Sequence, residues 1–302
     1  MKKVFVVVLH YKGRQFTRQC LLSLEKIRAT DFSVKIVVVE NHSPEPIEKL
    51  KKEFKKAVFL KNSQNLGFAE GNNVGIREVL KKKGDYVLVL NNDTTVDKNL
   101  LSELVRAAEK DRKIGIVAPK IYFAPGYEYH LSRYKPSEQG EVLWYAGGKI
   151  DWQNVLCSHR GVDEVDKGQY DKQVNTDYTS GCAMLIKRQV FEKFGLLDKR
   201  YFLYLEDVEF CQRAKKAGFK VFYVPKAKIW HFNAGSSEVG GPLHDYFLTR
   251  NRMLFGLKYV SWRAKFNLIK ESIKLLITGR EWQRIAIRDF YQRKLGKGSW
   301  HD

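Results

Sequence analysis

The sequence of 302 residues contains few cysteines and no long apolar run. Its four cysteines (Cys20, Cys157, Cys182 and Cys211) are scattered, without a Cys-x-x-Cys pair or a nearby pair of histidines. We therefore expect neither a zinc site nor a disulfide framework, and a reducing cytosol is the simplest compartment. The run Val4–Leu9 is too short for a signal peptide, and no segment approaches the ~20 apolar residues of a membrane span.

Acidic residues are scarce relative to basic ones. The chain has 34 Asp and Glu against 54 Lys and Arg, a net charge of +20, and from Asp245 onward it has 5 against 13. This excess suits an anionic partner, such as nucleic acid, an acidic membrane surface or a phosphorylated ligand. With 44% hydrophobic residues, the chain is long enough to bury a substantial core.

The sequence also contains neither a Walker loop nor a G-x-G-x-x-G fingerprint, which argues against ATP hydrolysis and NAD chemistry. It does have a glycine-rich loop over Asn62–Gly75. The glycines permit close backbone approach, and the loop opens onto a predicted helix whose free amides could face an anion.

Three apolar runs predict strands buried on both faces, as in a parallel sheet: Val4–Leu9, Ile36–Val39 and Tyr86–Leu90. Helical periodicity separates them, which predicts an α/β fold with a nucleotide-binding half. The other predicted helices and strands are helices at Ile47–Phe54, Asn72–Leu80, Ser102–Glu109 and Val208–Ala217, and strands at Ile114–Ala118, Met184–Ile186 and Lys220–Val224. Residues 123–178 are predicted to be long functional loops, and the chain from His244 onward to be helical.

Each of the first three strands ends in polar residues. His10 follows the first, Glu40 to Ser43 the second, and Asn91 to Thr95 the third. In a parallel sheet these clusters line one crevice, where Asp93 is well placed to meet a metal and a phosphate. The alternative is that they only form turns and helix caps.

Glu206 and Asp207 follow an aromatic run and precede a helix, where acidic residues can simply cap the helix. Because adjacent side chains point in different directions, one of them could instead face the crevice as a general base. His231 follows a further apolar run. It is either a structural histidine or, together with Asp93, a ligand for a divalent metal.

In the order and spacing of these motifs, the chain resembles family 2 glycosyltransferases with the GT-A fold, especially the bacterial rhamnosyltransferase-like and galactofuranosyltransferase-like branch. The resemblance covers about residues 4–232. It rests on the strand Val4–Leu9, Glu40-Asn41-His42-Ser43, Asn65-Leu66-Gly67-Phe68-Ala69-Glu70-Gly71-Asn72, Leu90-Asn91-Asn92-Asp93, Thr179-Ser180-Gly181-Cys182, Tyr204-Leu205-Glu206-Asp207-Val208-Glu209-Phe210-Cys211-Gln212-Arg213 and Trp230-His231.

The resemblance implies a role for each matching residue. Asp207 would be the general base, with Glu206 beside it, and Asp93 and His231 would bind Mg²⁺ or Mn²⁺. The donor, a dTDP- or UDP-linked sugar, would contact the three strand ends and the glycine-rich loop. The residues in question are His10, Glu40, Asn41, Ser43, Asn65, Gly67, Asn72, Asn91, Asn92 and Asp93. Ser180, Gly181 and Cys182 would bind the acceptor.

One departure from the family pattern concerns its D-x-D element, which reads Asn91-Asn92-Asp93 here and leaves one carboxylate. Amide oxygens can still ligate a divalent ion, with less charge. The function implied is inverting transfer of a rhamnose-like or other hexose to a hydroxyl of a glycan or lipid-linked acceptor, in cell-surface polysaccharide synthesis. A catalytic domain over 1–243 and a helical extension over 244–302 are expected.

Two other functions compete with this one. A nucleic-acid-binding protein would suit the isoelectric point of about 9.6 and the 13% aromatic content, but no recognised nucleic-acid motif appears, so no such partner is expected. A sugar-nucleotide nucleotidyltransferase would need a basic glycine-rich loop near the N-terminus. The segment Lys12-Gly13-Arg14 matches such a loop only weakly.

The C-terminal region carries an apolar stripe at helical spacing with basic residues beside it. The stripe comprises Trp262, Phe266, Ile269, Ile273, Leu276 and Ile277, and the nearby lysines are Lys265, Lys270 and Lys274. This pattern is typical of a helix in an anionic membrane interface, which would make a cytoplasmic protein peripheral to the membrane. The alternative is that the stripe packs on the catalytic domain or on a second subunit of a homo-oligomer.

Overall fold

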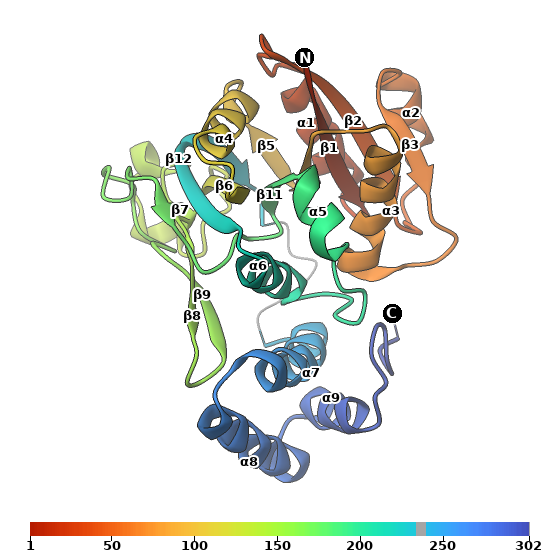
Figure 1. Ribbon diagram of the computed structural model, residues 1–302, viewed down its shortest axis with the longest axis vertical. Helices are drawn as coiled ribbons and strands as arrows, with labels where there is room; N and C mark the ends of the chain where they lie inside the picture. The colour runs from red at the N-terminus through yellow and green to blue at the C-terminus, as the bar shows by residue number, and fades with distance from the viewer. Residues whose placement is uncertain (234–239, 302) are drawn as a thin grey trace.

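The structure is a computed structural model that describes residues 1–233 and 240–301 (Figure 1). These residues form a ten-stranded sheet in the order β10-β12-β6-β11-β4-β1-β2-β3, with β5 paired to β12 and β7 paired to β6. The strands are β1 (Lys2–His10), β2 (Phe32–Glu40), β3 (Val58–Lys61), β4 (Tyr86–Asn91), β5 (Thr94–Val96), β6 (Ile114–Phe123), β7 (Leu143–Tyr145), β8 (Gly148–Asp151), β9 (Leu156–His159), β10 (Val174–Asn175), β11 (Ala183–Lys187) and β12 (Lys220–His231). The predicted α/β class with a mixed, mostly parallel sheet is confirmed.

The sheet is buried on both faces, as its continuous apolar strands predict. Along β1, Val4, Val6 and Val8 join one hydrophobic cluster while Phe5 and Val7 join the other. One face is covered by α1 (Arg14–Glu25), α2 (Glu48–Glu53) and α4 (Leu100–Glu109), and the other by α3 (Gly67–Lys81), α5 (Arg188–Phe194) and α6 (Glu206–Lys216). Two short 3-10 helices, η1 (Leu131–Arg133) and η2 (Pro136–Glu138), lie between β6 and β7.

Several predicted boundaries were wrong. The short, half-buried strand β3 was missed, and α3 begins at Gly67 instead of Asn72. Strand β6 does not end at Pro119. The missing amide of Pro119 is tolerated because β12 shifts register directly beyond it and β11 pairs with β6 only at Ile116 and Val117.

Residues 123–178 are also more regular than predicted, because they contain β7, the β8–β9 hairpin and β10. The two apolar runs that end at Val224 and His231 belong to one long strand, β12. The strand predicted at Lys220–Val224 therefore continues through the apolar run before His231.

The C-terminal region forms α7 (Pro242–Tyr259), α8 (Trp262–Thr278) and α9 (Glu281–Tyr291), which confirms its helical character. These helices lie at the end of the molecule away from the sheet, as Figure 1 shows. Helix α7 contacts the segment before α6 through Arg250 and Asn251, which are both fully buried. Both side chains donate to the Tyr201 carbonyl. The division between residues 243 and 244 stays a prediction.

Candidate active site

The carboxyl ends of β1, β2 and β4 meet at one edge of the sheet, as the strand-end pattern predicted. In the register of the parallel strands, His10 lies opposite Glu40, and Leu9 lies opposite Asn91. The three polar clusters are therefore neighbours in space. This edge is where ligands bind in open α/β sheets.

His10 forms the centre of a buried network at this edge. Its Nδ1 lies 2.8 Å from Thr17 Oγ1 and its Nε2 lies 3.0 Å from Ser43 Oγ. The side-chain amide of Asn92 donates to the same Thr17 oxygen at 2.8 Å and to the Lys12 carbonyl at 2.8 Å. Burial lowers the pKa of His10, which favours a neutral ring. His10 and Thr17 thus fix the turn at Asn92. Sequence reasoning missed Thr17, while direct nucleotide contacts of His10 stay a prediction.

Asn41 organises the loop that precedes α3. Its buried amide donates to Asn65 Oδ1 at 3.0 Å and to the Gly67 carbonyl at 3.1 Å. Its oxygen accepts from the Leu66 amide at 3.1 Å and from Asn62 Nδ2 at 2.9 Å. Asn41 therefore holds Asn65 and Gly67 in place beside the end of β2.

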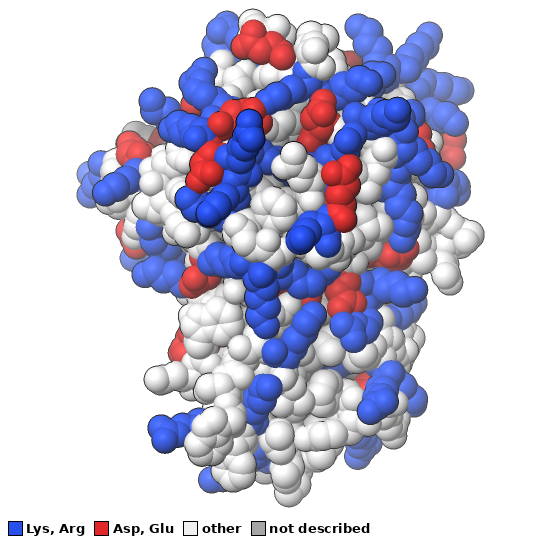
Figure 2. Space-filling view, viewed as in Figure 1, with Lys and Arg blue, Asp and Glu red and all other residues white. Residues whose placement is uncertain are grey.

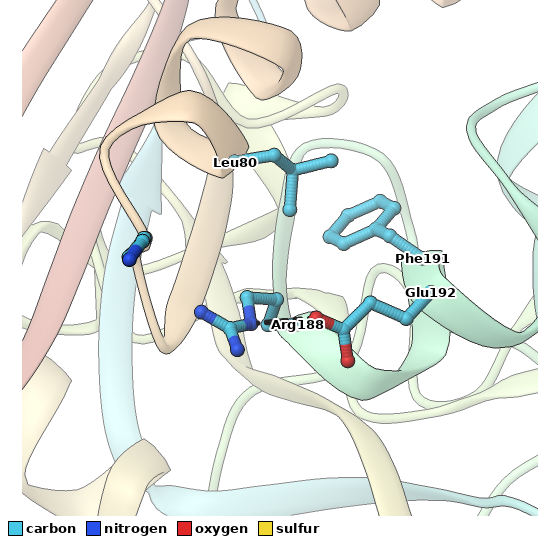
Figure 3. A pocket seen from close by; sticks show the side chains of 5 residues that line it. Leu80, Arg188, Phe191 and Glu192 are labelled. Carbon is cyan, nitrogen blue, oxygen red and sulfur yellow. Dashed lines mark ion pairs between the residues drawn. The ribbon is translucent and has the colours of Figure 1, made fainter.

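Glu40 sits at the end of β2 with its side chain buried and its carboxylate 3.2 Å from Lys61 Nζ. It lines a hollow of about 120 Å³ together with Ile47, Glu48, Lys51, Phe59, Leu60 and Lys61. A larger hollow of about 420 Å³ lies elsewhere, between the end of α3 and α5 (Figure 3). Its lining contains none of the predicted site residues, and its Arg188 and Glu192 pair with each other.

The expectation that the first amides of α3 face an anion is wrong for two of them. The N–H groups of Phe68 and Ala69 donate to the Phe202 carbonyl at 2.6 and 3.3 Å. Gly67 is in the left-handed region, and a Cβ on it would lie 2.5 Å from that carbonyl oxygen, so the close approach requires glycine. Farther along α3, Asn72 is buried and its amide donates to the Phe68 carbonyl at 2.9 Å.

Asp93 and His231 are brought together, as predicted for a pair of metal ligands. Asp93 Oδ1 and His231 Nε2 are 3.2 Å apart. Two neighbouring ligands of an octahedral ion with bonds of about 2.1 Å lie about 3 Å apart, so the pair fits two positions around Mg²⁺ or Mn²⁺. Within residues 1–233 and 240–301, no group of three or more His, Cys, Asp or Glu side chains could hold a metal.

Glu206 and Asp207 open α6 after a strained turn. Asp207 accepts backbone N–H groups at both oxygens, from Gly181 at 2.7 Å and from Val208 at 2.7 Å. Burial raises the pKa of Asp207, although these two donors oppose the rise. Glu206 is more deeply buried, and burial together with the Asp207 charge raises its pKa well above the usual range. Of the two, Asp207 is the carboxyl group whose charged form the neighbouring N–H groups stabilise, and Glu206 is the one more strongly biased toward its protonated form.

The segment Ser180–Cys182 joins the two carboxylate regions. Gly181 donates to Asp207 as described, and the Cys182 carbonyl accepts from the Asn91 N–H at 2.9 Å. Ser180 and Cys182 are both buried, and Ser180 Oγ accepts from the Cys182 N–H at 3.2 Å. The turn after β4, the predicted acceptor loop and the head of α6 thus form one continuous hydrogen-bonded unit.

Sequence reasoning missed the contribution of α7 to this unit. Phe202, Tyr204 and Leu205 are all in the left-handed region, which is costly for residues other than glycine. The side-chain amide of Asn251 donates to the carbonyls of Tyr201, Leu203 and Tyr204 at 2.7–2.8 Å. The only signal in the sequence was an Arg-Asn pair inside a largely apolar helix.

A family model described as glycosyl transferase family 2 matches residues 5–195. The chain is 25% identical over 241 residues to the N-acetylglucosaminyl-diphospho-decaprenol L-rhamnosyltransferase of Mycobacterium tuberculosis, covering 77% of this chain and 76% of the relative. It is 21% identical over 291 residues to the rhamnosyltransferase WbbL of Escherichia coli, covering 94% of this chain and 98% of the relative.

Among solved structures, the fold is similar to that of GalNAc-T7 with UDP, GalNAc and Mn²⁺, with a TM-score of 0.66 and 17% identity. That match covers 96% of this chain and 55% of the GalNAc-T7 chain. The mannosyltransferase PcManGT from Pyrobaculum calidifontis, in complex with GDP-Man and Mn²⁺, matches with a TM-score of 0.56 and 12% identity, covering 96% of this chain and 74% of the other. At these identities the likeness concerns the fold.

Proposed function

The chain belongs to glycosyltransferase family 2 and has the GT-A fold, and on this premise we propose that it transfers a sugar with inversion from a nucleoside diphosphate to an acceptor hydroxyl. The proposed donor is a dTDP- or UDP-linked rhamnose or other hexose, and the acceptor a glycan or a lipid-linked glycan in cell-surface polysaccharide synthesis. The names of two relatives support this choice. Both name a rhamnosyltransferase, and one of them names a decaprenol diphosphate as part of the substrate.

One observation supports this proposal above the others. The segment Ser180–Cys182 is hydrogen-bonded to Asp207 on one side and to Asn91 on the other. A sugar held at the turn after β4 would therefore lie beside a carboxylate that can act on the acceptor. Proximity of this kind is what a single displacement requires, since base, acceptor and donor must meet at once.

The reaction follows from the ionisation of the two carboxyl groups. Asp207 takes the proton of the acceptor hydroxyl as its oxygen bonds to the anomeric carbon, and the bond from that carbon to the diphosphate oxygen breaks. The nucleoside diphosphate leaves with the bonding electrons. Because attack comes from the face opposite the leaving group, the anomeric configuration inverts. Glu206 is buried, and its raised pKa favours the protonated form, so it takes no proton in this proposal.

Asp93 and His231 would hold Mg²⁺ or Mn²⁺. When bound, such an ion supplies positive charge that offsets the charge developing on the leaving diphosphate. The side-chain amide nitrogen of Asn92 donates to Thr17 and to the Lys12 carbonyl, so these two bonds do not use its side-chain oxygen. Metal dependence is part of this proposal.

Within the described residues, no helix has both the length and the apolar character that crossing a bilayer requires. We place the enzyme in the cytoplasm, at the inner face of the membrane, where a lipid-linked acceptor would be found. The surface that would make this contact is treated separately below, because its test does not involve the reaction.

The experiment that tests the function uses a panel of nucleotide sugars with Mn²⁺. Thermal stabilisation of the protein should follow donor affinity, with about 2.7 kcal/mol gained at a donor concentration of 100 times Kd. The stabilising donor is then incubated with hydroxyl acceptors, and the anomeric configuration of the product is read by NMR. Inversion is expected. A retained configuration, or stabilisation by no donor, would overturn the proposal.

A further inference from the structure

Helix α8 has two apolar faces, of which the protein buries only one. Ala264, Leu268 and Ser272 are buried, and Leu275 packs partly against the core. On the other face, the exposed fractions are 73% for Trp262, 66% for Phe266, 38% for Ile269, 53% for Ile273 and 74% for Ile277. The predicted alternative in which this stripe packs on the catalytic domain is therefore wrong for these five residues.

The exposed apolar residues form one continuous stripe. At about 100° per residue, the five side chains fall within a sector of about 80°, roughly opposite the buried side chains. Five of the 13 large hydrophobic side chains exposed in residues 1–233 and 240–301 lie on this one helix of 17 residues. A concentration of this size marks a contact surface, because isolated exposed apolar residues are ordinary but clusters are not.

The charges beside the stripe are almost all positive. Helix α8 carries Arg263, Lys265, Lys270 and Lys274 and one acid, Glu271. Glu271 is neutralised by Arg252 of α7, which donates to both of its oxygens at 2.6 and 2.8 Å. In Figure 2, the end of the molecule formed by α7, α8 and α9 shows mainly blue and white atoms with little red.

We propose that the exposed face of α8, defined by Trp262, Phe266, Ile269, Ile273 and Ile277, docks in the interface of an anionic membrane. An apolar stripe with aromatic residues and a basic border matches the acyl boundary and the anionic headgroups of such a surface. A second copy of the chain fits less well, because pairing two stripes face to face would bring the two basic borders together and cost Coulomb energy.

The docking helix is firmly attached to the rest of the molecule. Leu268 packs directly on Gly256 of α7, where an added Cβ would lie 2.4 Å from it, and the Arg252–Glu271 pair joins the same two helices. Helix α7 in turn bonds the loop before Glu206 through Asn251. Docking through α8 would therefore hold the whole enzyme in a defined orientation on the bilayer.

The test is sedimentation of the full chain with vesicles, without substrates, so that its outcome is independent of the proposed reaction. The probes are phosphatidylcholine vesicles with and without phosphatidylglycerol. We expect binding only to the anionic vesicles, release at about 1 M NaCl, where the Debye length is about 3 Å, and at least about tenfold weaker binding for the triple variant Lys265→Gln/Lys270→Gln/Lys274→Gln.

Two matched controls separate docking from general charge and apolarity. Lys49→Gln/Lys55→Gln/Lys56→Gln removes the same charge from exposed positions on and after α2 and should leave binding within about twofold, since these residues lie far from α8. Trp262→Gln/Phe266→Gln/Ile273→Gln should abolish binding with an unchanged melting temperature, whereas Leu131→Gln, also at an exposed apolar residue, should not.

Three results would overturn the proposal. The first is equal binding by the apolar triple variant and the wild type, and the second is equal weakening by both lysine triples. The third is indifference to anionic vesicles together with a dimer, seen by analytical ultracentrifugation, that the apolar triple variant dissociates. That last result would assign the α8 stripe to a second copy of the chain.

Discussion

The side-chain amide of Asn251 donates a hydrogen bond of 2.8 Å to the backbone carbonyl of Tyr204, two residues before Glu206. The same amide reaches the carbonyls of Tyr201 and Leu203. A helix that follows the catalytic motifs in the chain thus holds the backbone that leads into them. Because Tyr204 is in the left-handed region, this support stabilises a conformation that the loop alone would leave.

Replacing Asn251 by Ala should therefore impair the active site as well as stability. It removes the side-chain donor from the carbonyls of Leu203 and Tyr204, at a cost of about 1–3 kcal/mol each before relaxation, so the melting temperature should fall. The Tyr201 carbonyl still accepts from Arg250 and from the Leu203 N–H. At temperatures where circular dichroism shows a folded protein, we expect kcat to fall about tenfold or more, with a smaller change in KM for the donor. Asn267→Ala, at an exposed position of α8, is the control and should change neither quantity. An Asn251→Ala enzyme with reduced stability and unchanged kcat would limit Asn251 to a structural role.

Asp207→Asn should abolish transfer while donor binding survives within a few-fold. The amide can still accept from Gly181 but cannot take a proton, and a general base contributes typically ~10²–10⁴-fold to the rate. Calorimetry of donor binding and single-turnover assays separate the two effects, with Asp31→Asn as an exposed control. In the wild type, kcat should fall as the pH is lowered through the raised pKa of Asp207, since the base must be ionised. Equal losses of affinity and turnover would make Asp207 a binding residue.

Much of the fold could be predicted because the strands of the first half are uninterrupted apolar runs in the sequence. Val4 to Val8 and Tyr86 to Leu90 are apolar without interruption, as strands buried on both faces must be. Strand β3 was missed because it is short and none of its four residues is fully buried: three are half-buried and Lys61 is exposed. Strand β6 was cut short because Pro119 usually ends a strand, and only the register shift in β12 shows why it does not.

The candidate site was predictable where a side chain follows a strand directly, as Asn92 and Asp93 do. The contact of Asp93 with His231 also matches the prediction, and its role as a metal site stays open to experiment. By contrast, nothing local in the sequence indicates that Asn251 bonds the loop before Glu206, some 45 residues earlier. The sequence also does not indicate that the Phe202 carbonyl accepts from the first N–H groups of α3, because this depends on a tertiary contact between distant segments.

Asp93→Ala and His231→Ala should each weaken Mn²⁺-dependent donor binding, and the two losses should be less than additive in the double variant. Residues that share one ion lose it together, so the second substitution removes little more. Titration calorimetry of the donor with and without Mn²⁺ measures the effect, and His130→Ala, at an exposed histidine, is the control. Additive losses would separate the two residues, and full activity in EDTA would remove the metal from the proposed mechanism.

Glu206→Gln should stabilise the protein increasingly as the pH rises. Burial and the Asp207 charge raise the pKa of Glu206 in the folded state well above its ordinary value near 4.5, so the folded protein keeps a proton that the unfolded chain releases. The wild type therefore loses stability from about pH 4.5 upward until the folded pKa is reached, by at most ~1.4 kcal/mol per pH unit, and glutamine removes this loss. Urea unfolding at pH 5, 6, 7 and 8 measures the difference, with Glu141→Gln as the control for a carboxylate lost from the surface. A difference between Glu206→Gln and wild type that stays constant with pH would mean that Glu206 ionises in the folded enzyme, and Glu206 would then join Asp207 as a candidate base.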